Sequence, residues 1–253
     1  MSITKPYYRI YRPGLGADPV YNPTNGFVRD NLFINEEEQR SMIMAARLLL
    51  DDFKRLLEYI EPDSRNAAVF SHRIYELLLR TCTEVESNCK GILKANNYRA
   101  VNRSGKSKKD YDMNDYKKIE QSSHLSGYIV HYSNWLPNKY TSKPFAAWAE
   151  NGALPWYCAY NKVKHNRCQF FPLAHLSNLL DAICGLLCII HSQIGNASRR
   201  INGDNHYVST FEPNVSIGAF EIIPPQFSEE DSYDFVWNDL KSDPNRFQCF
   251  PFE

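Results

Sequence analysis

The sequence predicts a mainly α protein, an up-and-down four-helix bundle with a long insertion between helices two and three and a small irregular or β C-terminal extension. Four segments repeat apolar residues at spacings of three and four, the period of one helix face. Residues 96–154, which are rich in basic and aromatic side chains, separate these segments into two pairs. The domain organisation expected is an extended arm at 1–35, the bundle with its insertion at 36–195, and an acidic, aromatic extension at 196–253 packed on the bundle.

The first two helices are predicted from their end signals and apolar stripes. Asn35 precedes three glutamates, a pattern typical of an N-cap followed by acidic residues that the helix dipole favours, so the first helix is expected at 36–60. Pro62 ends it. The second helix is expected at 64–95. Glu86 lies on the flank of its apolar stripe, where a carboxylate needs a partner because burying a bare charge is costly.

The insertion begins with a basic stretch. Its cations include Arg103, Lys106, Lys108 and Lys109, and no acid occurs between 94 and 109. We expect either a loop that contacts phosphates or an ordinary solvated loop. A short helix at 111–121 and a short strand at 128–132 are expected to follow.

The second pair of helices follows the insertion. Pro155 stands where a helix tolerates its missing N–H, and Phe170-Phe171-Pro172 is expected to end this third helix. The fourth helix is expected at 173–194 with Gly195 after it. Its apolar residues cover more than half of its circumference, so it is predicted to be the central helix. His175 and Asp181 interrupt the apolar run, which favours a buried helix over a membrane span.

Further along, short strands or a final helical turn are expected at 208–211, 215–220 and 235–240.

The composition of the chain limits the classes of function that it can have. The 253-residue chain has a formal net charge of zero, so any attraction to nucleic acid or membrane must be local. Seven cysteines without a Cys-x-x-Cys pair indicate reduced thiols, and residues 1–12 lack the apolar core of a signal peptide. We therefore expect a cytoplasmic protein with no membrane partner.

One face of the third helix carries the candidate site. Helical spacing places these side chains together: Tyr157, Tyr160, Asn161, Lys164, His165 and Cys168. His165 is the candidate general acid or base, because imidazole titrates near neutral pH. Lys164 and Arg167 are candidates to hold a phosphate, Asn161 to orient it, and Tyr157 and Tyr160 to stack on a base.

This set of groups suits metal-independent cleavage of RNA, in which the ribose 2′-hydroxyl is the nucleophile. His165 has no second His or carboxylate at metal-ligand spacing on its helix, so we expect no metal and no cofactor. The alternative is a structural one. Asn161, His165 and Glu86 would then form a satisfied polar network that fixes helix register.

The motif from Tyr160 to His165 resembles that of the HEPN superfamily of helical-bundle ribonucleases and nucleotide-binding proteins. Asn161 and His165 match the family motif, and Glu86 resembles the acidic residue that many members place opposite. Tyr160 stands where the family has its catalytic Arg, so either Arg167 replaces that Arg or cleavage has been lost. The resemblance implies a homodimer with facing motif helices, an RNA substrate, and a role in toxin–antitoxin systems or anti-phage defence.

Three functions remain open at this stage. The first is a metal-independent endoribonuclease of the HEPN type. The second is a non-catalytic helical module that binds a nucleotide, RNA or a partner protein and regulates another enzyme. The third is a structural subunit of a larger complex, which the abundant aromatics and the acidic C-terminal extension favour.

Overall fold

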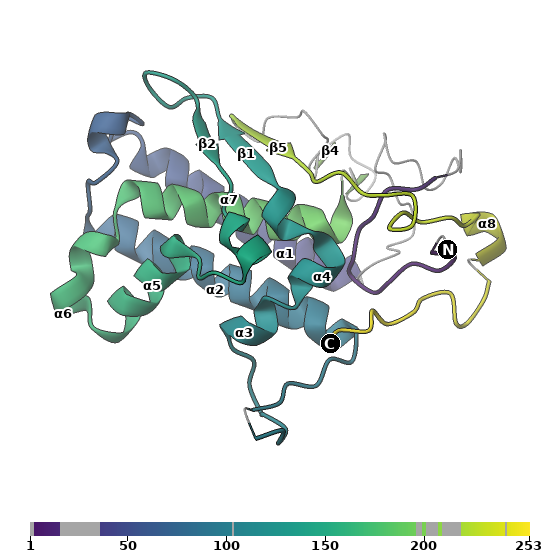
Figure 1. Ribbon diagram of the computed structural model, residues 1–253. Helices are drawn as coiled ribbons and strands as arrows, with labels where there is room; N and C mark the ends of the chain where they lie inside the picture. The colour runs from purple at the N-terminus through teal and green to yellow at the C-terminus, as the bar shows by residue number, and fades with distance from the viewer. Residues whose placement is uncertain are drawn as a thin grey trace.

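A computed structural model describes residues 3–15, 36–102, 104–195, 199–200, 207–208, 219–240 and 242–253. Its fold is mainly α, as predicted (Figure 1). Arg103, most of the expected N-terminal arm and most of the two strands expected between 208 and 220 lie outside these residues.

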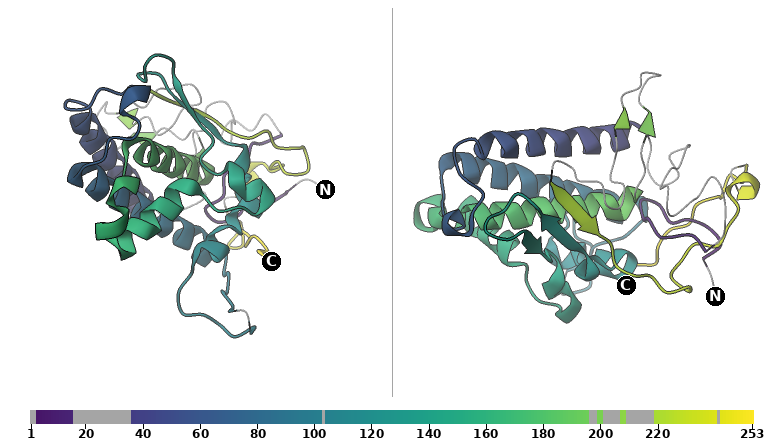
Figure 2. Two further views of the ribbon diagram at one scale, coloured as in Figure 1. Left: turned by 60° about the vertical axis from the view of Figure 1, so that its left-hand side comes forward. Right: turned by 90° about the horizontal axis from the view of Figure 1, so that it is seen from above.

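The four longest helices of the described residues are α1 (Glu36–Leu56), α2 (His72–Ala95), α5 (Pro155–His165) and α7 (Leu176–Ile194). Helix α2 contacts α1, α5 and α7, and α7 also contacts α1 and α5. Seen from above, α1, α2 and α7 run side by side, and the segments of the insertion lie on the far side of α7 from α1 (Figure 2).

The second helix begins later than the expected residue 64. The Ser71 side chain accepts a hydrogen bond from the Ile74 N–H at 3.2 Å and so caps α2. Residues 64–66 instead form a separate turn, η1 (Ser64–Asn66), whose first residue follows the capping Asp63. Because a side chain that caps a helix satisfies otherwise unpaired N–H groups, Ser71 sets the start of α2 and leaves Phe70 outside it.

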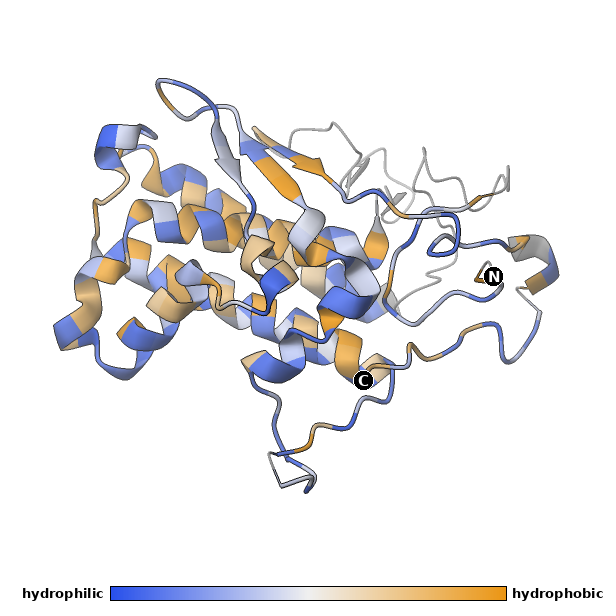
Figure 3. Ribbon diagram, viewed as in Figure 1, coloured by the Kyte–Doolittle hydropathy of each residue, from blue (hydrophilic) through white to orange (hydrophobic). Residues whose placement is uncertain are grey.

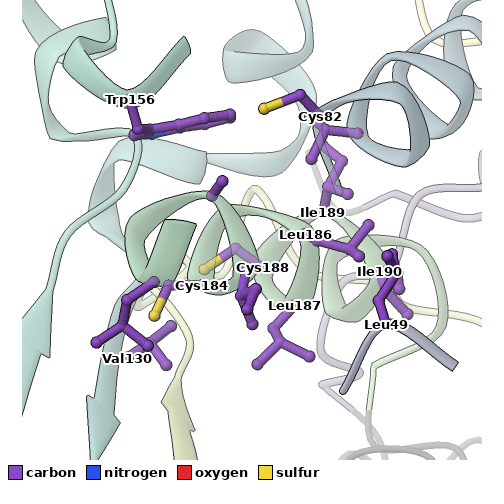
Figure 4. Close-up of a cluster of buried hydrophobic side chains, with 14 of the residues drawn as sticks. Leu49, Cys82, Val130, Trp156, Cys184, Leu186, Leu187, Cys188, Ile189 and Ile190 are labelled. Carbon is purple, nitrogen blue, oxygen red and sulfur yellow. The ribbon is translucent and has the colours of Figure 1, made fainter. Parts of the chain in front are cut away.

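Helix α7 is the centre of the core, with both its ends close to those expected. Every residue from Ala182 to Ile194 is buried, and Gly195 follows the helix at φ 58°. The side chains of Leu49, Cys82, Val130 and Trp156 surround it from different elements (Figure 4). Helix α7 is long and apolar enough to cross a membrane by length and composition. However, 83% of its 18-residue apolar stretch is buried inside the protein, as in the core helix of a soluble protein.

The insertion and the C-terminal extension together build a small antiparallel sheet. Strand β1 (Ile129–Tyr132) lies between β2 (Tyr140–Ser142) and β5 (Phe220–Ile223). Val130 pairs with Ser142 on one side and with Ile222 on the other. Asp181 of α7 accepts hydrogen bonds from the Tyr140 hydroxyl at 3.0 Å and from Ser142 Oγ at 2.6 Å, so it anchors β2 to the central helix.

Short elements complete the described fold. They are α3 (Met113–Tyr116), α4 (Ile119–Ser123), η2 (Leu125–Gly127), η3 (Ala146–Glu150), α6 (Arg167–Phe170), η4 (Phe171–Leu173), β3 (Arg199–Arg200), β4 (Tyr207–Val208) and α8 (Trp237–Leu240).

The Arg12 guanidinium, 2% exposed, donates to Asp231 Oδ1 at 2.6 Å and to the Ser122 carbonyl at 2.9 Å. It thereby joins residues 3–15 to both the C-terminal extension and the insertion.

Truncation of a side chain on α7 tests its place at the centre of the core. We expect Leu187→Ala to lower the free energy of unfolding by about 2–5 kcal/mol, because the lost side chain leaves a cavity in a packed interior. Leu48→Ala on α1 is the matched control, since Leu48 is 52% exposed, and it should change that free energy by less than about 0.5 kcal/mol. Urea denaturation measures both, and equal losses would contradict this core assignment.

Candidate nucleic-acid interface

Helix α5 ends at His165, earlier than the sequence predicts. Asn166 leaves the helical conformation at φ −145° and ψ 76°, and its side chain accepts a hydrogen bond from the Gln169 N–H at 3.3 Å. Asn166 is therefore the N-cap of α6. As a result, Arg167 and Cys168 lie on α6 and do not continue the face of α5.

The predicted polar face is divided between the core and the solvent. Tyr157 and Tyr160 are buried, at 7% and 2% exposed, while Asn161 is half-buried and Lys164 and His165 are exposed. This face lies on the edge of the buried side of α5, so its side chains differ in how deeply they are buried. The rings of Tyr157 and Tyr160 are enclosed by the core, and the predicted stacking of these two tyrosines on a base is not available in this structure.

The two tyrosine hydroxyls belong to a polar network between α5 and α2. The Tyr157 hydroxyl donates to Glu86 Oε1 at 2.8 Å, and Glu86 Oε2 lies 4.0 Å from Lys90 Nζ. Burial raises the pKa of Tyr157, and its hydrogen bond to Glu86 raises it further. The half-buried carboxylate of Glu86 thus has the partner that its position demands.

Tyr160 and Lys164 make a second link in the same region. Lys164 Nζ donates to the Tyr160 hydroxyl at 2.9 Å, and this hydrogen bond raises the pKa of Lys164. Burial raises the pKa of Tyr160, although Lys164 opposes the shift. The ammonium of Lys164 therefore lies beside the Tyr160 hydroxyl.

Four basic side chains gather at the junction of α5 and α6. This basic cluster consists of Lys162, Lys164, His165 and Arg167, all exposed. In the described part of the chain, His165 has no hydrogen-bond or ion-pair partner. The turn between the two helices is hydrophilic on the ribbon coloured by hydropathy (Figure 3). Lys162, Lys164 and His165 lie in the last turn of α5, where the helix dipole favours positive charge.

Three of these cations lie over aromatic rings. Lys162 Nζ is 5.8 Å from the centre of the Phe170 ring, and Lys164 Nζ is 4.9 Å from that of Tyr160. Arg167 Cζ is 5.7 Å from the centre of the Tyr75 ring on α2. Such contacts hold a cation near the surface without neutralising its charge.

An aromatic patch adjoins the basic cluster through Tyr75. It consists of Phe70, His72, Tyr75 and Phe171. The Phe171 ring centre lies 5.4 Å from that of Phe70, 4.8 Å from His72 and 6.0 Å from Tyr75. Phe70 is 44% exposed. Phe70 falls within the range predicted for the second helix, 64–95, but it lies just before α2; the sequence signal for its exposure is Ser71, a residue suited to cap α2.

The basic loop lies far from this cluster. Lys106 and Lys109 are exposed, but Lys108 Nζ is held by Asp112 at 2.7 Å and by Asp115 at 2.6 Å, so its charge is compensated. The loop follows the C-terminal end of α2, whereas the aromatic patch begins at its N-terminal end. The 24 residues of α2 separate them by about 36 Å at 1.5 Å per residue.

No group of three or more His, Cys, Asp or Glu side chains that could hold a metal ion occurs among the residues that the structure describes.

No protein-family model matches the chain, and no curated protein or solved structure is detectably similar to it.

A double-mutant cycle tests the link between α5 and α2. We expect Tyr157→Phe and Glu86→Ala each to lower the free energy of unfolding by about 1–3 kcal/mol, because each leaves a partly buried polar group without its partner. Combined, they should cost less than the sum, with a coupling of about 0.5–3 kcal/mol. Tyr59→Phe is the control, since Tyr59 is 86% exposed. Additive losses in urea denaturation would show that the hydrogen bond does not stabilise the fold.

Proposed function

We propose that the protein is an HEPN-like RNA-binding protein whose α1, α2, α5 and α7 form an up-and-down four-helix bundle. The observation that carries this proposal is the contact of the basic cluster with the aromatic patch, through Arg167 over Tyr75. The contacts of α2 and α7 with each other and with α1 and α5 support the bundle. The matches of Asn161 and His165 to the family motif support the resemblance.

The chemistry of this surface suits single-stranded or looped RNA. Exposed cations attract phosphates, and unstacked bases bind the faces of aromatic side chains. Phe70 and Phe171 supply such rings beside Arg167, in place of the buried Tyr157 and Tyr160. Because the chain has no net charge, the attraction must come from local groups of cations such as this one.

A second candidate function is metal-independent endoribonuclease activity, which the exposed and unpartnered imidazole of His165 favours. Asn161 lies one turn before it, and Lys164 and Arg167 supply positive charge for the transition state. One imidazole cannot act as both acid and base in the same step, so this candidate requires a homodimer that brings two copies of His165 to one RNA. A role as a toxin or a defence effector belongs to this candidate.

RNA binding by the basic cluster is tested with charge-removing variants. Lys162→Ala combined with Arg167→Ala should weaken binding of a single-stranded RNA and reduce the slope of log affinity against log salt by about 1.4, from about 0.7 per phosphate contact. Lys139→Ala combined with Lys143→Ala removes the same charge from exposed positions near β2. Fluorescence anisotropy at several salt concentrations measures both. Equal weakening by the two pairs would contradict a defined site.

Cleavage is tested separately from binding. If the second candidate holds, the wild type cleaves RNA in the presence of EDTA, and His165→Ala abolishes cleavage while retaining most of the binding. His131→Ala, a change on β1 away from the cluster, should cleave as the wild type does. Gel analysis of labelled RNA gives the result. Intact RNA with bound wild-type protein would eliminate the endoribonuclease and leave the binding proposal standing.

A further inference from the structure

A cavity of about 960 Å³ lies at the end of α2 opposite to the basic cluster. Its walls come from the end of α2 and the loop after it, from α3 with Lys118 just before α4, and from residues 249–253. Figure 1 shows the C-terminus beside the end of α2, directly above that loop. The volume is at the upper end of the range for small-molecule sites.

Two walls of the cavity are held in place by hydrogen bonds. The Tyr98 hydroxyl donates to Asp115 Oδ1 at 3.1 Å, and the Tyr98 ring meets Phe252 edge to face with 6.1 Å between their centres. The Phe250 N–H donates to the Asn96 side chain at 2.8 Å, which fastens the C-terminal segment to the end of α2. These contacts fix Tyr98 and the segment that carries Phe250 and Phe252 in the cavity wall.

Three basic and three acidic side chains line the cavity, and two of the three cations are not paired with an acid among the described residues. Lys108 is bound to Asp112 and Asp115, as described above. Arg99 and Lys118 also line the cavity, and the described residues include no ion-pair partner for either. The remaining acidic side chain in the lining is the exposed Glu253.

We propose that this cavity binds a nucleotide, with its base against Tyr98 and Phe252 and its phosphate paired with Arg99 and Lys118. Two further lining residues, Asn97 and Asn114, carry amides that can hydrogen-bond a base edge. The nucleotide is either a free molecule or one unit of an RNA strand. If the ligand is one unit of an RNA strand, this proposal depends on the RNA-binding function proposed above. If the ligand is a free nucleotide, it does not.

Isothermal titration of the full chain with adenosine monophosphate, adenosine and a single-stranded RNA hexamer tests this site. We expect the monophosphate to bind and adenosine to bind at least about tenfold more weakly, because it lacks the charged group. Arg99→Ala and Lys118→Ala should each weaken binding of the monophosphate about tenfold, as expected for a hydrogen bond to a charged group. Tyr98→Leu should also weaken it by about tenfold or more, since stacking is lost.

Matched variants separate this site from the basic cluster. Lys139→Ala with Lys143→Ala should leave monophosphate affinity unchanged, and so should Lys162→Ala with Arg167→Ala. Glu253→Gln should strengthen binding, because it removes a negative charge from the lining. Circular dichroism confirms that each variant is folded, and Lys118→Gln repeats the test with a smaller structural change.

The binding results distinguish a free nucleotide from one unit of an RNA strand. Monophosphate binding that is lost on removal of Arg99 and Lys118 supports a free nucleotide as the ligand. Hexamer binding alone, weakened by the same two changes, supports an RNA unit. The proposal is overturned if the folded wild type binds neither probe, or if the variant without both cations binds as the wild type does. Loss of RNA binding at the basic cluster with retained monophosphate binding would contradict only the proposed function.

Discussion

The fold depends on the burial of one apolar helix. Helix α7 is apolar around most of its circumference, and exposure of such a surface to water costs about 25 cal/mol per Å². One partner helix covers only one side of it. The chain therefore brings α1, α2 and α5 together with the sheet around α7, and segments that are distant in the sequence meet on its surface (Figure 4).

The small sheet is a consequence of this requirement. Two short strands of the insertion cannot form a stable sheet by themselves. The addition of β5 from the C-terminal extension and the contact of Asp181 with Tyr140 and Ser142 place the sheet against α7. The insertion and the extension are thus parts of the same layer, although about 80 residues separate β2 from β5.

The candidate interface follows from the way in which α5 is held. Glu86 and Tyr157 fix α5 on α2, and this orientation buries Tyr160 while the end of the helix projects beyond the core. Asn166 then stops the helix, so His165 and its neighbouring cations are presented at a turn. The structural alternative predicted from the sequence joined Asn161, His165 and Glu86; in the structure Glu86 is bonded to Tyr157 instead, and this bond holds α5 so that the exposed cluster lies at its end.

The sequence by itself determined the mainly α class, the approximate ranges of the long helices and the central place of α7, because apolar periodicity reports directly which side of a helix is buried. It also indicated that Glu86 needs a partner. Only the tertiary structure decided how deep each member of the polar face lies, since depth depends on what packs against the edge of the helix. Likewise, periodicity cannot show that Phe70 meets Phe171 at one end of α2 and that Tyr98 meets Phe252 at the other, because contacts between distant segments arise from the way in which the whole chain covers α7.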